Sequence, residues 1–196
     1  MRAFIAIALP DEIHREVARQ QAAFRAACPD ARWTRAEGIH LTLKFLGEIN
    51  GPQVQDVTVA LAHLGNFNRF KAEVKGFGFF PDARRPRVFW AGLAAPPDLA
   101  RLAAGVEDAM ASLGFEREQR NYNPHLTLAR FNNPRPQPRL QDAIALQAGA
   151  SLGQFEVSEF LLFESRLSPG GAEYLKVARF SGEPSASNFQ FPVSNS

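Results

Sequence analysis

The sequence predicts an α+β fold in which two similar lobes pack around a shared cleft. Strand-like and helix-like segments alternate along the chain, and each half gives the order strand, helix, strand, helix, strand. The tetrad His-Leu-Thr-Leu also occurs once in each half, at 40–43 and at 125–128. Two copies so far apart do not suit a solenoid, so a duplicated lobe is the simpler interpretation.

The elements of the first half follow from hydrophobic periodicity and from proline and glycine boundaries. We expect a strand at 2–9, a helix from 11 to about 27, a strand region at 33–49, a helix from 51 to about 64, and strands at 70–80 and 88–93. The last two strands are joined by a turn-prone segment, 81–86.

The second half repeats this order. We expect a helix from 97 to about 113, a strand at 122–131, a short helix at 140–146, and strands at 155–166 and 174–180 around a hairpin turn at 168–171. Residues 1–182 are therefore expected to form one bilobal domain. The tail 183–196 is rich in Ser, Asn and Pro, and we expect it to be poorly ordered.

Composition limits the class of protein. The formal net charge of +2 is too small to establish nucleic-acid binding, although 18 of the 22 basic residues are arginines, which suit phosphate contacts. A GC-rich genome would explain this arginine usage equally well. The single cysteine, Cys28, excludes an internal disulfide framework and a cysteine-rich zinc site. No apolar stretch reaches the roughly 18–20 residues of a membrane helix. We therefore expect a soluble cytoplasmic protein with no membrane partner.

Each tetrad is suited to present two polar, reactive side chains on one face of a rigid strand. Side chains alternate between the two faces of a strand, so His40 and Thr42 share one face while the two leucines can pack into the core. His125 and Thr127 repeat this arrangement. If the two lobes face each other, two imidazoles flank one pocket.

Two imidazoles in one pocket can perform acid and base catalysis together. Imidazole titrates near pH 6.5, so one ring can accept a proton from an attacking hydroxyl or water while the other protonates a leaving oxygen. The threonine hydroxyls can donate hydrogen bonds to phosphate oxygens. This set of groups suits attack at a phosphodiester without a metal or other cofactor.

The two tetrad histidines could also be structural residues or metal ligands. A single histidine in an apolar strand is usually structural, but two of the four histidines lie in identical tetrads in corresponding places. His14 and His63 fall in helical stretches and receive no function. A zinc site usually has three protein ligands, and neither tetrad adds a carboxylate or third histidine to its polar face. The sequence has no nucleophile elbow and no phosphate-binding glycine loop.

The chain resembles the 2H phosphoesterase superfamily, named for two His-x-Thr-x motifs, and within it the bacterial RNA 2′,3′-cyclic phosphodiesterases, also called 2′-5′ RNA ligases. The resemblance covers roughly residues 2–182. It is carried by the strand at 2–7, the segments 40–48 and 124–130, and the segment 165–174.

The resemblance implies a bilobal α+β fold with antiparallel sheets lining a central groove and helices outside. It implies that a terminal RNA 2′,3′-cyclic phosphate is hydrolysed to a 2′-phosphomonoester, with His40 as general acid and His125 as general base. Thr42 and Thr127 would bind the phosphate, and Arg130 would contact it. Because Arg130 lies five residues after His125, a regular strand would turn it to the opposite face, so a bend is needed.

Phe45 falls outside the His/Thr face of a regular strand and is expected in the core. The cluster Arg84, Arg85 and Arg87 either attracts RNA or forms a solvated turn. The substrate is expected to be RNA with a cyclic phosphate end, such as a tRNA fragment, bound by a monomer. The alternatives are a 2′-5′ ligase or 2′-5′ phosphodiesterase, and a non-catalytic RNA-end binder.

Overall fold

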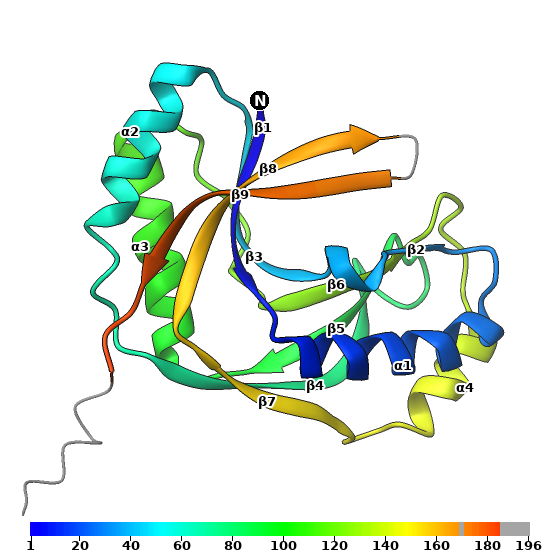
Figure 1. The fold of residues 1–196 in the computed structure, drawn as a ribbon. Helices are drawn as coiled ribbons and strands as arrows, with labels where there is room; N and C mark the ends of the chain where they lie inside the picture. The colour runs from blue at the N-terminus through cyan, green and yellow to red at the C-terminus, as the bar shows by residue number, and fades with distance from the viewer. Residues whose placement is uncertain (169–170, 185–196) are drawn as a thin grey trace, which may run out of the picture.

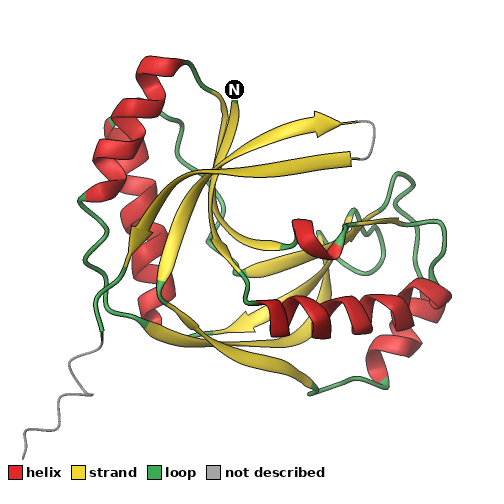
Figure 2. Ribbon diagram, viewed as in Figure 1, coloured by secondary structure: helices red, strands yellow, loops and turns green. Residues whose placement is uncertain are grey.

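In the computed structural model, which describes residues 1–168 and 171–184, the chain forms one curled antiparallel sheet with helices on its outer side (Figures 1 and 2). Eight strands of the described chain pair in the order β7-β4-β5-β6-β3-β1-β8-β9, and the short β2 joins the sheet as the ninth by pairing with β6. The predicted α+β fold is confirmed. The two lobes are the two halves of this sheet, and they meet where β3 and β6 pair.

The strands have the following bounds: β1 Arg2–Ala8, β2 Arg32–Trp33, β3 His40–Glu48, β4 Phe70–Phe80, β5 Val88–Ala94, β6 His125–Arg130, β7 Ser151–Val157, β8 Glu159–Ser168 and β9 Gly171–Ser181. The predicted strand at 155–166 is wrong as a single element, because Ser158 separates β7 from β8. These two strands then go to opposite edges of the sheet: β7 pairs with β4, and β8 pairs with β1 and β9.

Four α-helices and one 3-10 turn accompany the sheet in the described chain: α1 Asp11–Ala27, η1 Ala36–Gly38, α2 Gly51–Ala62, α3 Pro97–Ser112 and α4 Pro138–Ala145. The helix α2 begins with a capping box, in which Asn50 and Gln53 exchange side-chain-to-backbone hydrogen bonds. The helix α1 packs against α4 and β7, whereas α3 packs against α2 and β3. Figure 2 shows the pair α1 and α4 and the pair α2 and α3 at separate corners outside the sheet.

Two of the helices pack against the half of the sheet that does not contain the strand preceding them in the chain. The helix α1 follows β1 in the chain but lies against β7, at the far edge of the other half. In the same way α3 follows β5 but packs against β3. The buried residues of the helices and of the helix-facing side of the sheet therefore form one large hydrophobic core. A smaller cluster, Phe4, Ala6, Leu161 and Phe163, lies on β1 and β8.

The C-terminal segment is bonded to the body of the protein as far as Glu183. The Glu183 amide donates to the carbonyl of Phe67, and the Arg69 amide donates to the carbonyl of Glu183. The remainder of the predicted disordered tail, 185–196, lies outside the described residues, as does part of the predicted hairpin turn, 169–170. No helix in the described part of the chain is long and apolar enough to cross a membrane.

Candidate active site

The two tetrads lie side by side at the centre of the sheet. The strands β3 and β6 are antiparallel and pair at Leu41 and Leu126. This register places His40 opposite Thr127 and Thr42 opposite His125, so the two histidines are diagonal neighbours about 7–8 Å apart at Cα. The two imidazoles therefore project from neighbouring strands on the same face of the sheet.

The side-chain alternation predicted for the tetrads is confirmed. Both histidines and both threonines are half-buried, on the face of the sheet opposite to the helices. The leucines are in the core, with Leu41, Leu126 and Leu128 fully buried and Leu43 nearly so. The leucines therefore anchor the strands and the polar residues share one surface.

Each histidine is held by the carbonyl two residues before it. The Nδ1 of His40 lies 2.9 Å from the carbonyl oxygen of Gly38, and the Nδ1 of His125 lies 2.7 Å from that of Asn123. A carbonyl oxygen has no hydrogen to donate, so each Nδ1 carries the proton and donates it. The Nε2 atom of each neutral ring is then left unprotonated and able to accept a proton.

Aromatic rings surround His40. Phe4 stacks on its imidazole with the ring centroids 4.5 Å apart, Tyr174 meets it edge-on at 5.1 Å, and Phe163 lies behind Phe4. Burial among these rings lowers the pKa of His40 to about 4, because the imidazolium loses its hydration, and the nearby His14 also opposes protonation. In the free protein His40 is therefore neutral at neutral pH.

His125 has a similar but more open surrounding. Phe80 meets its ring edge-on at 4.8 Å, and Trp90 lies against Phe80. Burial lowers the pKa of His125, and the charge of Arg130 lowers it further. Trp90 covers Gly78 so closely that a Cβ atom there would lie 2.3 Å from the indole ring. Glycine at position 78 is thus needed for this aromatic wall.

Arg130 is on the side of His125, and a β-bulge explains how it gets there. In the pairing of β6 with β5, Thr127 is opposite Trp90 and Ala129 is opposite Phe89, so Leu128 is the extra residue. Leu128 and Ala129 are both buried, and Arg130 is exposed. The bend that the sequence required for Arg130 is this bulge.

The first tetrad has the same bulge, and it overturns the expectation for Phe45. In the pairing of β3 with β1, Thr42 is opposite Ala6 and Lys44 is opposite Ile5, so Leu43 is the extra residue. Leu43 and Lys44 are buried, while Phe45 is 66% exposed and lies 6.1 Å from Phe4. Phe45 is therefore not a core residue. It occupies the position that Arg130 has in the other half.

One residue near the site, His14, was not predicted from the sequence. His14 of α1 was given no function, yet its Nδ1 lies 2.8 Å from the carbonyl oxygen of Ala36 in η1. The same short turn supplies the Gly38 carbonyl that holds His40. Nothing in the local sequence indicates this contact, because it joins residues 22 positions apart.

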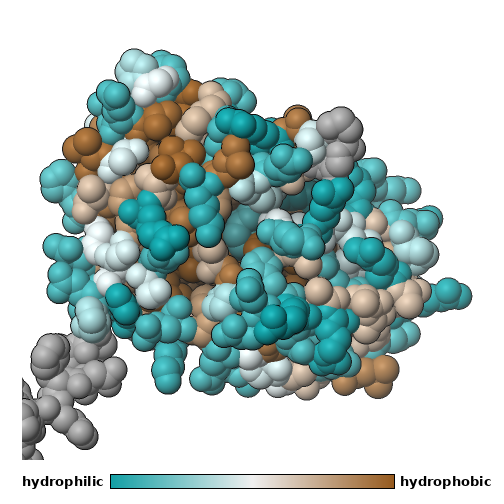
Figure 3. Space-filling view, in the orientation of Figure 1, coloured by the Kyte–Doolittle hydropathy of each residue, from teal (hydrophilic) through white to brown (hydrophobic). Residues whose placement is uncertain are grey.

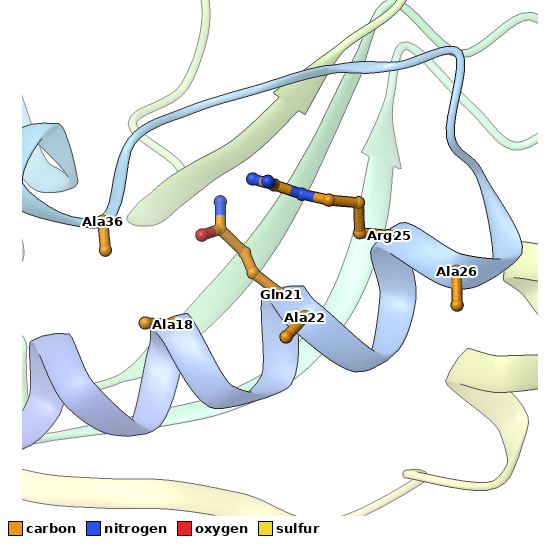
Figure 4. A pocket seen from close by; sticks show the side chains of 6 residues that line it. All are labelled: Ala18, Gln21, Ala22, Arg25, Ala26 and Ala36. Atoms are coloured by element: carbon orange, nitrogen blue, oxygen red, sulfur yellow. The ribbon is translucent and has the colours of Figure 1, made fainter.

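One surface depression lies away from the tetrads, against α1 and η1. It measures about 420 Å³ and is lined by Ala18, Gln21, Ala22, Arg25, Ala26 and Ala36 (Figure 4). Gln21 donates hydrogen bonds to the carbonyls of Thr34 and Leu128, so it ties α1 to the sheet. The depression contains no tetrad residue. No group of three or more His, Cys, Asp or Glu side chains able to hold a metal occurs among the residues described.

Paired imidazoles with free Nε2 atoms, flanked by two hydroxyls and an arginine, define an acid–base site suited to a phosphoester. Comparison with known proteins gives the family. The model of the LigT-like phosphoesterases matches residues 7–90 and 93–174, so this chain belongs to that family. The matched segments include both tetrads.

Individual relatives agree with this membership. The chain is 30% identical over 181 residues to the RNA 2′,3′-cyclic phosphodiesterase of Methanothermobacter thermautotrophicus, which covers 92% of this chain and 98% of that protein. It is 32% identical to the protein of the same name from Archaeoglobus fulgidus, over 89% and 96% of the two chains. The crystal structure of TT0787 from Thermus thermophilus superposes with a TM-score of 0.76 at 27% identity, over 92% of this chain and 97% of that one.

Proposed function

We propose that this protein is an RNA 2′,3′-cyclic phosphodiesterase that opens a terminal cyclic phosphate to a 2′-phosphomonoester without a metal. The observation that carries the proposal is the pair of histidines on one face, each with Nδ1 bound to a carbonyl and Nε2 available. The names of the relatives from Methanothermobacter and Archaeoglobus support the substrate class.

The proposed reaction is attack by water in line with the departing 3′ oxygen. Nε2 of His125 takes a proton from the water as its oxygen bonds to phosphorus, and the bond from phosphorus to the 3′ oxygen breaks. Nε2 of His40, protonated in the complex, gives its proton to that oxygen. The products are a 2′-phosphomonoester and a 3′-hydroxyl. Thr42 and Thr127 donate hydrogen bonds to the non-bridging oxygens, and Arg130 balances their charge.

The acid role requires that His40 gain a proton when the substrate binds. Its pKa of about 4 in the free protein reflects burial without a counter-charge. A phosphodiester anion placed between the two rings supplies that counter-charge and raises the pKa. The assignment of His40 as acid and His125 as base follows the family resemblance. We also propose that the enzyme acts as a monomer, because one chain supplies both histidines. A cytoplasmic location and RNA ends such as tRNA fragments as substrate complete the proposal.

A single assay tests the reaction. A short RNA with a 2′,3′-cyclic phosphate end is incubated with the protein in the presence of a chelator, and the product end is identified. We expect a 2′-phosphate. A 3′-phosphate product would mean that the 2′ oxygen leaves, and loss of activity in the chelator would overturn the metal-independent mechanism. Joining of RNA ends would instead favour ligation.

A further inference from the structure

Six arginines without partners gather around the far end of β6. Each is exposed, and none makes a side-chain hydrogen bond or ion pair to the described part of the chain; they are Arg32, Arg35, Arg84, Arg85, Arg87 and Arg130. This group is called the arginine patch below. Most other arginines are compensated: eight form ion pairs with carboxylates, and Arg25 lies over the ring of Trp33.

Backbone pairing shows that these arginines, far apart in sequence, come together. Arg32 of β2 pairs with Arg130 of β6, which pairs on its other side with Val88 of β5. The carbonyl of Arg87 accepts a hydrogen bond from the amide of Phe131. Arg84 and Arg85 lie in the turn between β4 and β5, which ends at this same edge. Figure 1 shows β2, β5 and β6 converging there.

The patch has little negative charge to offset it. Asp82 is the acidic residue of the turn, and its carboxylate accepts hydrogen bonds from the amides of Arg84 and Arg85. Asp30 and Glu37 are the acidic residues closest in sequence to Arg32 and Arg35, and Asp30 already pairs with Arg135 at 3.8 Å. Figure 3 shows that the side of the molecule carrying β2 and β6 is mostly hydrophilic, whereas apolar side chains gather over the side of α2 and β9. Six exposed like charges gathered around one end of the sheet repel one another, and a bound polyanion would relieve this repulsion.

The patch is continuous with the histidine site. The bulge at Leu128 turns Arg130 to the side of His125, and Arg130 is paired in the sheet with Arg32. Arg130 lies five strand residues, about 16 Å along the chain, beyond His125, and its charge acts on the His125 imidazole. Arg130 is the link between the terminal phosphate and the rest of the patch.

We propose that the arginine patch binds the sugar-phosphate backbone of a single-stranded RNA whose cyclic-phosphate end lies between His40 and His125. The inference rests on the proposed function and extends it, because it makes an oligonucleotide, rather than a single nucleotide, the preferred substrate. The chain of the RNA leaves the site along β6 toward β2 and the turn between β4 and β5.

The test compares two substrates and two double variants. The substrates are a ten-nucleotide RNA and a mononucleoside, both with a 2′,3′-cyclic phosphate. The variant Arg32→Gln/Arg87→Gln removes two charges of the patch, and Arg2→Gln/Arg15→Gln removes two exposed, unpaired arginines elsewhere. For the patch variant we expect KM for the oligonucleotide to rise roughly tenfold with kcat unchanged, and no change for the mononucleoside. The control variant should match the wild type.

Salt dependence gives a second measurement. Removing two phosphate contacts should make the slope of log affinity against log salt shallower by about 1.4, since each contact to a single strand contributes about 0.7. If KM and the salt slope of the patch variant are unchanged, or if its activity falls equally on both substrates, the arginine patch does not bind the RNA backbone. The proposed function is unaffected by either result. If the wild type hydrolyses neither substrate, the proposed function fails. Fluorescence anisotropy then tests separately whether the patch binds the oligonucleotide. Weaker binding by the patch variant than by the wild type supports RNA binding at the patch, and equal binding rejects it.

Discussion

At the scale of single residues, the histidines His40 and His125 carry the proton transfers of the proposed reaction. Replacing either with alanine should lower kcat by about 10²–10⁴-fold, because each transfer contributes about that much. His63 is a matched control: it is exposed and its Nδ1 contacts the carbonyl of Val59 in its own helix. His63→Ala should keep full activity. Rates of His40→Ala and His125→Ala within a few-fold of the wild type would refute the mechanism.

The lowered pKa of His40 also links stability to pH. The unfolded chain binds the proton of this residue near pH 6.5, whereas the folded protein resists it down to about pH 4. The unfolded state therefore binds more protons between these values, and the free energy of unfolding falls as pH drops from about 6.5 to 4. The contribution is on the order of 3 kcal/mol. Urea unfolding across this range should show a smaller loss in His40→Gln. An equal loss in both proteins would mean that His40 is not the cause.

At the scale of elements, the turn η1 positions His40, and α1 holds this turn through His14. His14→Ala should lower kcat roughly tenfold, because small displacements of a catalytic group are costly. His14→Asn keeps a donor where Nδ1 was and should recover most of the rate. In both variants the pKa of His40, followed by NMR, should rise, since the charge of His14 opposes its protonation. A pKa that stays in place would show that His14 does not influence the site.

The matched bulges at Leu43 and Leu128 are the second feature at this scale, since they bring Phe45 and Arg130 to the face of the sheet that carries the histidines. Exposed Phe45 is placed to stack on a base. Phe45→Ala should raise KM for RNA roughly tenfold, because stacking on one base contributes about 1–3 kcal/mol. Phe45→Trp should restore binding, and Leu146→Ala, at another exposed apolar residue, should have no effect. Unchanged KM in Phe45→Ala would exclude stacking at this residue.

At the scale of the whole molecule, the halves are joined by more than the pairing of β3 with β6. Lys44 of β3 is buried, and its ammonium group donates to the Glu107 carboxylate of α3 at 2.7 Å and to the Glu116 carbonyl at 2.8 Å. Tyr122, just before β6, donates a hydrogen bond from its hydroxyl to the carbonyl of Thr42. The helices α1 and α3 also cross to the opposite half, so the halves share their core.

This shared core predicts a single unfolding transition. Trp33 and Trp90, on β2 and β5, belong to one half of the sheet, so tryptophan fluorescence reports that half while far-UV circular dichroism reports the whole chain. The urea midpoints from the two signals should coincide. Lys44→Met should shift both midpoints down together, because Lys44 connects β3 to α3 and to the segment before β6. Separate midpoints would show that the lobes fold independently.

Much of this protein follows from local patterns in its sequence. Periodicity located most helices and strands, and strand alternation placed His40 with Thr42 and His125 with Thr127, because these depend on residues close in the chain. The repeated tetrad indicated that the two sets belong to one site. The same alternation failed beyond each tetrad, since a bulge depends on the partner strand; Phe45 was misplaced for this reason.

Features that depend on pairing between distant segments were revealed only by the tertiary structure. It merged the lobes into one sheet, separated β7 from β8, and set the register of Leu41 with Leu126 that faces each histidine toward the other motif's threonine. It also brought His14 to the turn before His40 and gathered the arginine patch from three distant segments. These contacts join residues far apart along the chain, and no local pattern encodes which distant strand or carbonyl a residue will meet.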